Sequence, residues 1–122
     1  EPIHAGGLRY HGMAPLVSHI YELGLVEAIA IPQTECFAGA LQFAQSEGIV
    51  PAPEPTHAIA AAIREALLCK ETGEEKTILT ALCGHGHLDL ASYDKYMSGE
   101  MVDLDLSDDV IEAAMKGVPV IG

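Results

Sequence analysis

Residues 77–87 read TILTALCGHGH, and this stretch decides the predicted fold. Its first six residues are mostly apolar and partly β-branched, a pattern typical of a central strand buried on both faces of a parallel sheet. A second apolar run, VEAIAI at 26–31, stops at Pro32 and also predicts a short strand. After the first run, Cys83, two glycines and two histidines predict a loop at the edge of the sheet.

Amphipathic segments alternate with these two runs. In the first of them Leu16, Ile20 and Leu23 recur at helical spacing, which predicts that this face of the helix is buried. The predicted helices cover residues 15–23, 34–48, 55–70, 91–97 and 107–116. Helices that alternate with strands predict an α/β fold, a three-layer parallel sheet with helices on both faces.

The composition is that of a globular domain, since 49% of the 122 residues are hydrophobic. A net charge of −12 argues against nucleic acid and anionic membranes as partners. The sequence has no apolar run of membrane-spanning length and no signal peptide. Three widely spaced cysteines, Cys36, Cys69 and Cys83, predict reduced thiols in a cytoplasmic protein.

Three glycine-bearing segments, 5–12, 48–54 and 83–87, fall where predicted strands and helices meet. In open α/β sheets, ligands bind beyond the carboxyl ends of the strands. The last segment brings a thiol and two imidazoles to such an edge, and its glycines let a flat ligand approach closely. An ordinary flexible turn with solvent-facing histidines is the alternative, and the pattern leaves both open.

Two charged residues of these segments are further candidates. Glu54 follows the stiff connector 51–53, so its carboxylate either caps the next helix or points into a cleft. Arg9 is one of only two arginines and pairs with a carboxylate either of the protein or of a substrate. His57, three residues after Glu54, is interpreted as a helix-packing histidine.

The spacing His85-x-His87-x-Asp89 is also that of metallo-β-lactamase-type hydrolases, in which alternate residues converge on zinc. That motif continues with a histidine directly after the aspartate, where this sequence has Leu90. The other histidines all lie upstream, whereas that family draws its further ligands from downstream. A zinc hydrolase is therefore the less favoured alternative.

Three blocks in order resemble the C-terminal third of the tryptophan synthase β chain, most closely its second, β-like branch. They are HAGGLRYHGMAP at 4–15, EGIVPAPE at 47–54 with HA after it, and LCGHGH at 82–87. The resemblance implies that residues 1–100 are the C-terminal part of a fold type II pyridoxal-phosphate domain. It also implies a lyase that joins L-serine to indole by β-replacement. Residues 101–122 are predicted to form an acidic tail with a short helix.

The resemblance further implies roles for single residues. Glu54 matches the family glutamate beside the cofactor ring, near its phenolic oxygen and imine. Cys83 stands where the family usually has a serine beside the pyridine nitrogen, and Gly84 and His85 continue the cofactor contact. Because a thiol is a weaker hydrogen-bond partner than a hydroxyl, the electronics of the ring depart from the family pattern.

Two features of the first block concern the substrate and a cation. Arg9 takes the place of a main-branch aspartate that helps to close a lid over the substrate, in agreement with the second branch. The backbone around Tyr10 and Gly12 matches the region that binds a monovalent cation.

The family's Schiff-base lysine and phosphate loop lie N-terminal to the matching region, and none of the lysines here aligns with that lysine. The chain also starts at Glu1 instead of Met, which predicts a segment of a longer polypeptide or one from which an upstream part was removed. We therefore expect it to be inactive alone and to be completed by an N-terminal portion, in a homodimer with an α-type subunit as a further candidate partner. A stand-alone, non-catalytic binding or regulatory module is the alternative.

Overall fold

The computed structural model describes residues 3–9, 12–104 and 107–118. Its α-helices are α1 (Pro15–Glu22), α2 (Gln33–Glu47), α3 (Pro53–Thr72), α4 (Leu90–Met97) and α5 (Asp108–Met115), and its short 3-10 helices are η1 (Gly6–Leu8) and η2 (Gly86–Leu88). The five helices predicted from the sequence are confirmed, with ends that differ by about two residues at most.

The predicted three-layer parallel sheet is wrong. Helices make up 58% of the described residues and strand about 2%, with no sheet among them. Residues 26–31 and 77–82 form no strand within the described ranges. The β-bridge that the structure records is antiparallel and joins Pro51 to His85. Because a strand needs a neighbour for its backbone hydrogen bonds, an apolar, β-branched run alone does not make a sheet.

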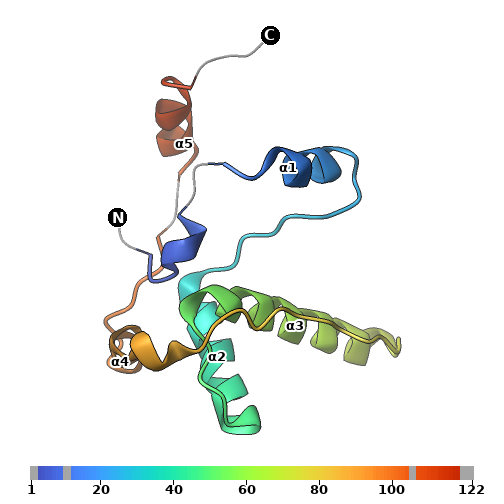
Figure 1. Cartoon of the computed structure of the whole chain (residues 1–122), viewed down its shortest axis with the longest axis vertical. Helices are drawn as coiled ribbons and strands as arrows, with labels where there is room; N and C mark the ends of the chain where they lie inside the picture. Colours follow the sequence, from blue (N-terminus) through green and yellow to red (C-terminus); the bar gives the residue numbers. More distant parts are fainter. Residues whose placement is uncertain (1–2, 10–11, 105–106, 119–122) are drawn as a thin grey trace.

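Helices α2 and α3 pack against each other and make up much of the lower part of the molecule in Figure 1. Gly39 of α2 lies so near α3 that a Cβ atom on it would be 3.7 Å from the Cα atom of Ala60. Small residues at this crossing bring the two helix backbones close together. An aromatic core cluster beside the crossing joins α2 to α4 and to the segment after α4. Its members are Phe37, Ala40, Tyr93 and Met101.

The segment after α4 returns to the start of α2. The carboxylate of Asp103 accepts hydrogen bonds from the Thr34 N–H group, at 3.0 Å, and from the Thr34 hydroxyl. The side-chain amide of Gln33 donates to the carbonyl of Val102 at 2.5 Å. A remote carboxylate thus caps the N-terminus of α2, where free N–H groups favour negative charge. The predicted division of the chain at residue 100 stays a prediction.

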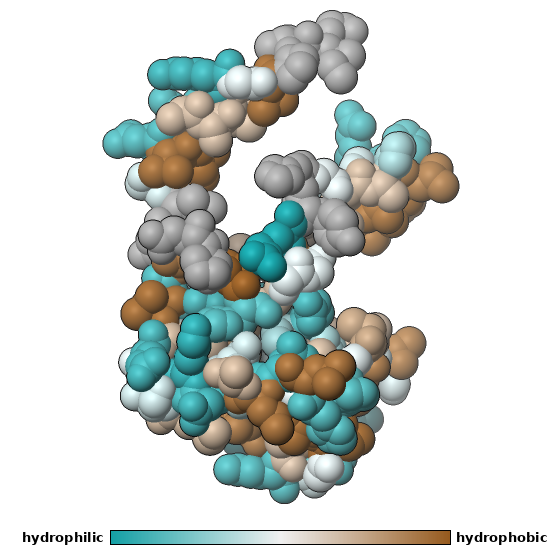
Figure 2. Space-filling view, turned by 60° about the vertical axis from the view of Figure 1, so that its left-hand side comes forward, coloured by the Kyte–Doolittle hydropathy of each residue, from teal (hydrophilic) through white to brown (hydrophobic). Residues whose placement is uncertain are grey.

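Helix α1 stands away from the α2–α3 body (Figure 1). The prediction of a buried face on it is wrong, since Leu16 is 80% exposed and Leu23 57% exposed. Extended residues such as Leu79 are exposed as well, and Figure 2 shows apolar residues at the molecular surface. Helical spacing gathers apolar residues on one face, but it does not supply a neighbour to cover that face.

None of the helices in the described part of the chain is long and apolar enough to cross a membrane.

His4 attaches the N-terminal segment to α4. Its imidazole Nδ1 lies 3.1 Å from the hydroxyl oxygen of Ser92, and its ring meets Phe37 edge-on at 6.1 Å. Burial lowers the pKa of His4 below the ordinary value of 6.5, and the positive charge of Lys95 lowers it further. The folded chain therefore favours the neutral imidazole.

We predict that this contact weakens in acid. Because the pKa of His4 is lower in the folded than in the unfolded chain, its contribution to stability is complete above pH 6.5 and is lost as the pH falls toward the folded-state pKa. The melting temperature of the wild type should therefore fall more steeply than that of His4→Gln between about pH 7 and about pH 5. Parallel curves for the two proteins would contradict the prediction.

Candidate functional site

The connector before α3 pairs with the loop that follows residues 77–82. The N–H group of Ala52 donates to the carbonyl of Gly84 at 3.0 Å, and the N–H group of Gly86 donates to the carbonyl of Val50 at 2.7 Å. The residues between these two pairs form the antiparallel bridge. The second and third glycine-bearing segments thus lie side by side.

The two glycines of the loop are required by this pairing. A Cβ atom on Gly86 would lie 2.4 Å from the carbonyl oxygen of Pro51, and one on Gly84 would lie 3.0 Å from the Cβ atom of Ala52. Real Cβ atoms do not approach a backbone oxygen so closely, so position 86 excludes any side chain. These glycines therefore allow the connector to approach the loop closely. The sequence had predicted that they allow a flat ligand to approach.

Glu54 connects the first glycine-bearing segment to the second. It lies in the first turn of α3, and its Oε1 atom accepts a hydrogen bond from the N–H group of Gly7 at 2.7 Å. A Cβ atom on Gly7 would be 3.1 Å from the Glu54 Cγ atom. The half-buried carboxylate is thus turned toward η1 and makes no capping hydrogen bond to its own helix.

We call the place where η1, the connector and the loop at 83–87 meet the junction, and Arg9 and Cys83 belong to two of these segments. A Cβ atom on Gly6 would be 3.4 Å from Nη2 of Arg9 and 4.0 Å from Oε1 of Glu54, so guanidinium and carboxylate face one position of η1. Cys83 directly precedes the paired Gly84, and its free thiol is exposed. The carboxylate of Glu54 and the guanidinium of Arg9 thus lie at η1, and Cys83 lies in the loop that pairs with the connector before Glu54.

The histidines of the loop are exposed, and the rings of His85 and His87 lie 4.7 Å apart. Nδ1 of His85 accepts a hydrogen bond from the His87 N–H group at 3.3 Å, while Asp89 precedes α4. Across the described ranges, no group of three or more His, Cys, Asp or Glu side chains is placed to hold a metal ion. The zinc alternative gains no support from this geometry.

The predicted monovalent cation site falls partly on Tyr10, which lies outside the described residues. Gly12, the other residue of that prediction, is exposed. The cation therefore stays a prediction.

No family model matches the chain. It is 66% identical over 103 residues to tryptophan synthase beta chain 2 of Aquifex aeolicus, an alignment that covers 84% of the chain and 24% of that relative. It is 62% identical over 100 residues to tryptophan synthase beta chain 2 of Methanosarcina acetivorans, with 82% and 23% covered. For the tryptophan synthase beta chain of Thermococcus onnurineus, the identity is 53% over 104 residues, with 85% and 24% covered.

The chain belongs to the tryptophan synthase β family. The resemblance seen in the three sequence blocks is thereby confirmed, including the match to a C-terminal portion of the second branch. The chain spans about a quarter of the length of the curated relatives it matches.

In this tryptophan synthase β segment, sequence reasoning missed Tyr93. Its hydroxyl donates a hydrogen bond to the carbonyl of Pro51 at 2.5 Å, and its ring packs against Phe37. Burial, aided by the negative charge of Asp89, raises the pKa of Tyr93 to about 12, so the hydroxyl stays protonated and donates. The available signal was a tyrosine in an amphipathic helix, because a buried tyrosine needs a partner for its hydroxyl.

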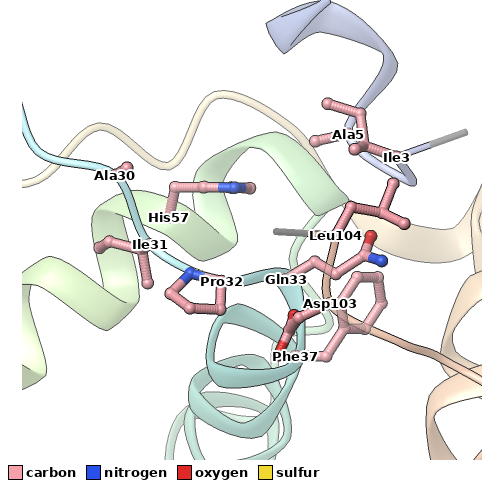
Figure 3. Close-up of a pocket in the computed structure, with 10 residues that line it drawn as sticks. All are labelled: Ile3, Ala5, Ala30, Ile31, Pro32, Gln33, Phe37, His57, Asp103 and Leu104. Atoms are coloured by element: carbon pink, nitrogen blue, oxygen red, sulfur yellow. The ribbon is translucent and has the colours of Figure 1, made fainter. Parts of the chain in front are cut away.

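Sequence reasoning on this β-family chain also missed a cavity of about 410 Å³ (Figure 3). The N-terminal segment, the residues leading into α2, α3 and the segment after α4 all contribute to its wall. The lining residues are Ile3, Ala5, Ala30, Ile31, Pro32, Gln33, Phe37, His57, Asp103 and Leu104. None of the predicted cofactor contacts is among them. Because these residues and Arg9 lie outside the cavity, we place the candidate site where η1, the connector and the loop meet.

His57, predicted to be a packing histidine, forms part of that wall. Its side chain extends from α3 into the view of Figure 3, and its Nδ1 atom lies 3.2 Å from the carbonyl oxygen of Pro53 one turn earlier. This local contact is compatible with a packing role.

Proposed function

We propose that the chain is the C-terminal part of a pyridoxal-phosphate-dependent tryptophan synthase β-type subunit, a lyase of tryptophan biosynthesis that joins L-serine to indole. The observation that carries the proposal is the backbone pairing of the connector with the loop. This pairing joins the segment that precedes Glu54 to the loop that contains Cys83, which supports a shared site for the two residues. Similarity to proteins named tryptophan synthase beta chain supports the same assignment.

The residues at the junction fit a planar heterocycle. The exposed thiol of Cys83 and the carboxylate of Glu54 are suited to its polar margins, whereas Gly84 and Gly86 pack against the connector. Pyridoxal phosphate, when bound, supplies an electron sink for chemistry on the amino acid.

In this proposal each residue has a distinct role. Glu54 would hold the margin of the ring that carries the phenolic oxygen, where its carboxylate would hold or move a proton. Cys83 would hold the margin of the ring that carries the pyridine nitrogen, with Gly84 and His85 continuing the contact. A thiol there would not impose the positive charge on that nitrogen that an aspartate would. Arg9, next to Glu54, takes part in closing the site over the substrate carboxylate.

We further propose that an N-terminal portion of the same subunit supplies the lysine and the phosphate loop, because no residue of this chain matches them. The chain alone is then inactive. A homodimer and an α-type partner subunit belong to the same proposal.

The proposal is tested in the complete subunit. The wild type should show the visible absorbance of bound pyridoxal phosphate and form tryptophan from serine and indole. Glu54→Gln should lower kcat about 100-fold, because an amide neither holds nor moves the proton. Steady-state kinetics and the absorption spectrum measure both effects.

Glu47→Gln is the matched control, since it makes the same change at an exposed position at the end of α2. It should leave kcat unchanged. A wild-type subunit without cofactor absorbance or tryptophan formation would overturn the proposed function. A normal kcat in Glu54→Gln would remove Glu54 from it.

A further inference from the structure

The connector of residues 50–53 is held from several sides. The loop at 84–86 pairs with it through two backbone hydrogen bonds, at 2.7 and 3.0 Å. The Tyr93 hydroxyl donates to the carbonyl of Pro51 at 2.5 Å, and the Thr56 hydroxyl donates to the carbonyl of Pro53 at 2.6 Å. Two prolines also restrict its backbone. The backbone of the connector is therefore rigid, and Glu54 directly follows it.

Tyr93 connects helix α4 to the connector. It lies on α4, which begins at Leu90 and follows the loop that contains Cys83 and the short helix η2. Its hydroxyl donates a hydrogen bond to Pro51 of the connector, which directly precedes Glu54. One side chain thus links the two segments from which the carboxylate and the thiol come.

The packing around Tyr93 leaves it little freedom. The side chain is 3% exposed, and its ring meets Phe37 edge-on, with centroids 5.0 Å apart and an angle of 67° between the rings. Without the hydroxyl, the Pro51 carbonyl would lose its hydrogen-bond donor in a buried setting, which is unfavourable. The hydrogen bond therefore sets the distance between α4 and the connector.

We propose that Tyr93 is a positioning residue, which fixes the separation of Glu54 and Cys83 at the two margins of the bound ring. This inference rests on the proposed function. It assigns to Tyr93 no contact with substrate or cofactor, and its effect passes through the connector. Loss of the hydroxyl should therefore change how the two groups meet the ring and leave the overall fold intact.

The test is Tyr93→Phe in the complete subunit. Amide hydrogen exchange should become faster at Ala52 and Gly86, because the connector loses one of its attachments. The absorption spectrum of the bound cofactor should shift, together with the pH dependence of kcat. We expect kcat to fall about tenfold while KM for serine changes less than about threefold.

Two controls separate positioning from general stability. Tyr96→Phe removes a hydroxyl from the same helix and from a ring that also stacks on Phe37, and it should leave exchange, spectrum and kinetics unchanged. Met101→Ala loosens the same core cluster but keeps the hydroxyl, so it should lower the melting temperature without moving the spectrum or the pH profile.

Each result decides the proposal. A Tyr93→Phe enzyme with wild-type spectrum, exchange and pH profile overturns it, as does one that only loses stability as Met101→Ala does. If Tyr93→Phe fails to fold, ortho-fluorotyrosine at position 93 is used instead, because it keeps the ring and makes the hydroxyl a stronger donor. An unchanged spectrum and pH profile in that variant would overturn the positioning role of Tyr93. A wild type without cofactor absorbance would instead contradict the proposed function itself.

Discussion

Gly86→Ala is expected to destabilise the chain by about 3 kcal/mol and to separate the connector from the loop. The new Cβ atom would lie 2.4 Å from the carbonyl oxygen of Pro51 and 2.9 Å from Cγ1 of Val50. A backbone oxygen cannot rotate away as a side chain can. The loop must move, and it would carry Cys83 away from the start of α3.

Urea unfolding of the wild type and the variant measures the loss of stability, and amide exchange at Ala52 reports the separation. Gly117→Ala is the matched control, because its Cβ atom would meet only the carbonyl of Ala114 at 4.0 Å, an ordinary contact. Its free energy of unfolding should stay within about 0.5 kcal/mol of the wild type. If the two variants unfold at the same urea concentration, the tight contact at Gly86 does not contribute to stability.

Phe37→Ala should have a still larger effect, a loss of about 4 kcal/mol in the free energy of unfolding. Phe37 is 2% exposed, and its ring contacts His4, Tyr93 and Tyr96. Truncation removes the centre of the cluster that joins the N-terminal segment, α2 and α4. The described core is small, so nearby groups can fill the resulting cavity only in part.

Phe43→Ala is the natural comparison, since Phe43 lies in the same helix but is only half-buried. Its substitution should cost about half as much or less, in proportion to the apolar surface that it keeps from water. Chemical denaturation of both variants gives the difference directly. Equal losses would show that Phe37 is not the centre of the core.

Part of the candidate site could be predicted from the sequence. The glycine-bearing segments, Glu54 after its proline-rich connector and Cys83 before its glycines were visible as local patterns. That the segments meet at one junction, with Glu54 bound to Gly7, depends on contacts between residues 47 positions apart. Tyr93 was missed for the same reason, since its partner Pro51 is 42 positions away.

The sequence by itself determined the helices and the family. Helix ends and amphipathic spacing are local properties, and three ordered blocks identify the tryptophan synthase β family without coordinates. Only the tertiary structure decided which segments pair through their backbones and which helix faces are buried. Among the described residues, the apolar run at 77–82, which predicted a sheet, has no strand beside it, and α1 has no buried residue. Periodicity records which side chains share a face, whereas sheets and cores require partners from distant parts of a chain.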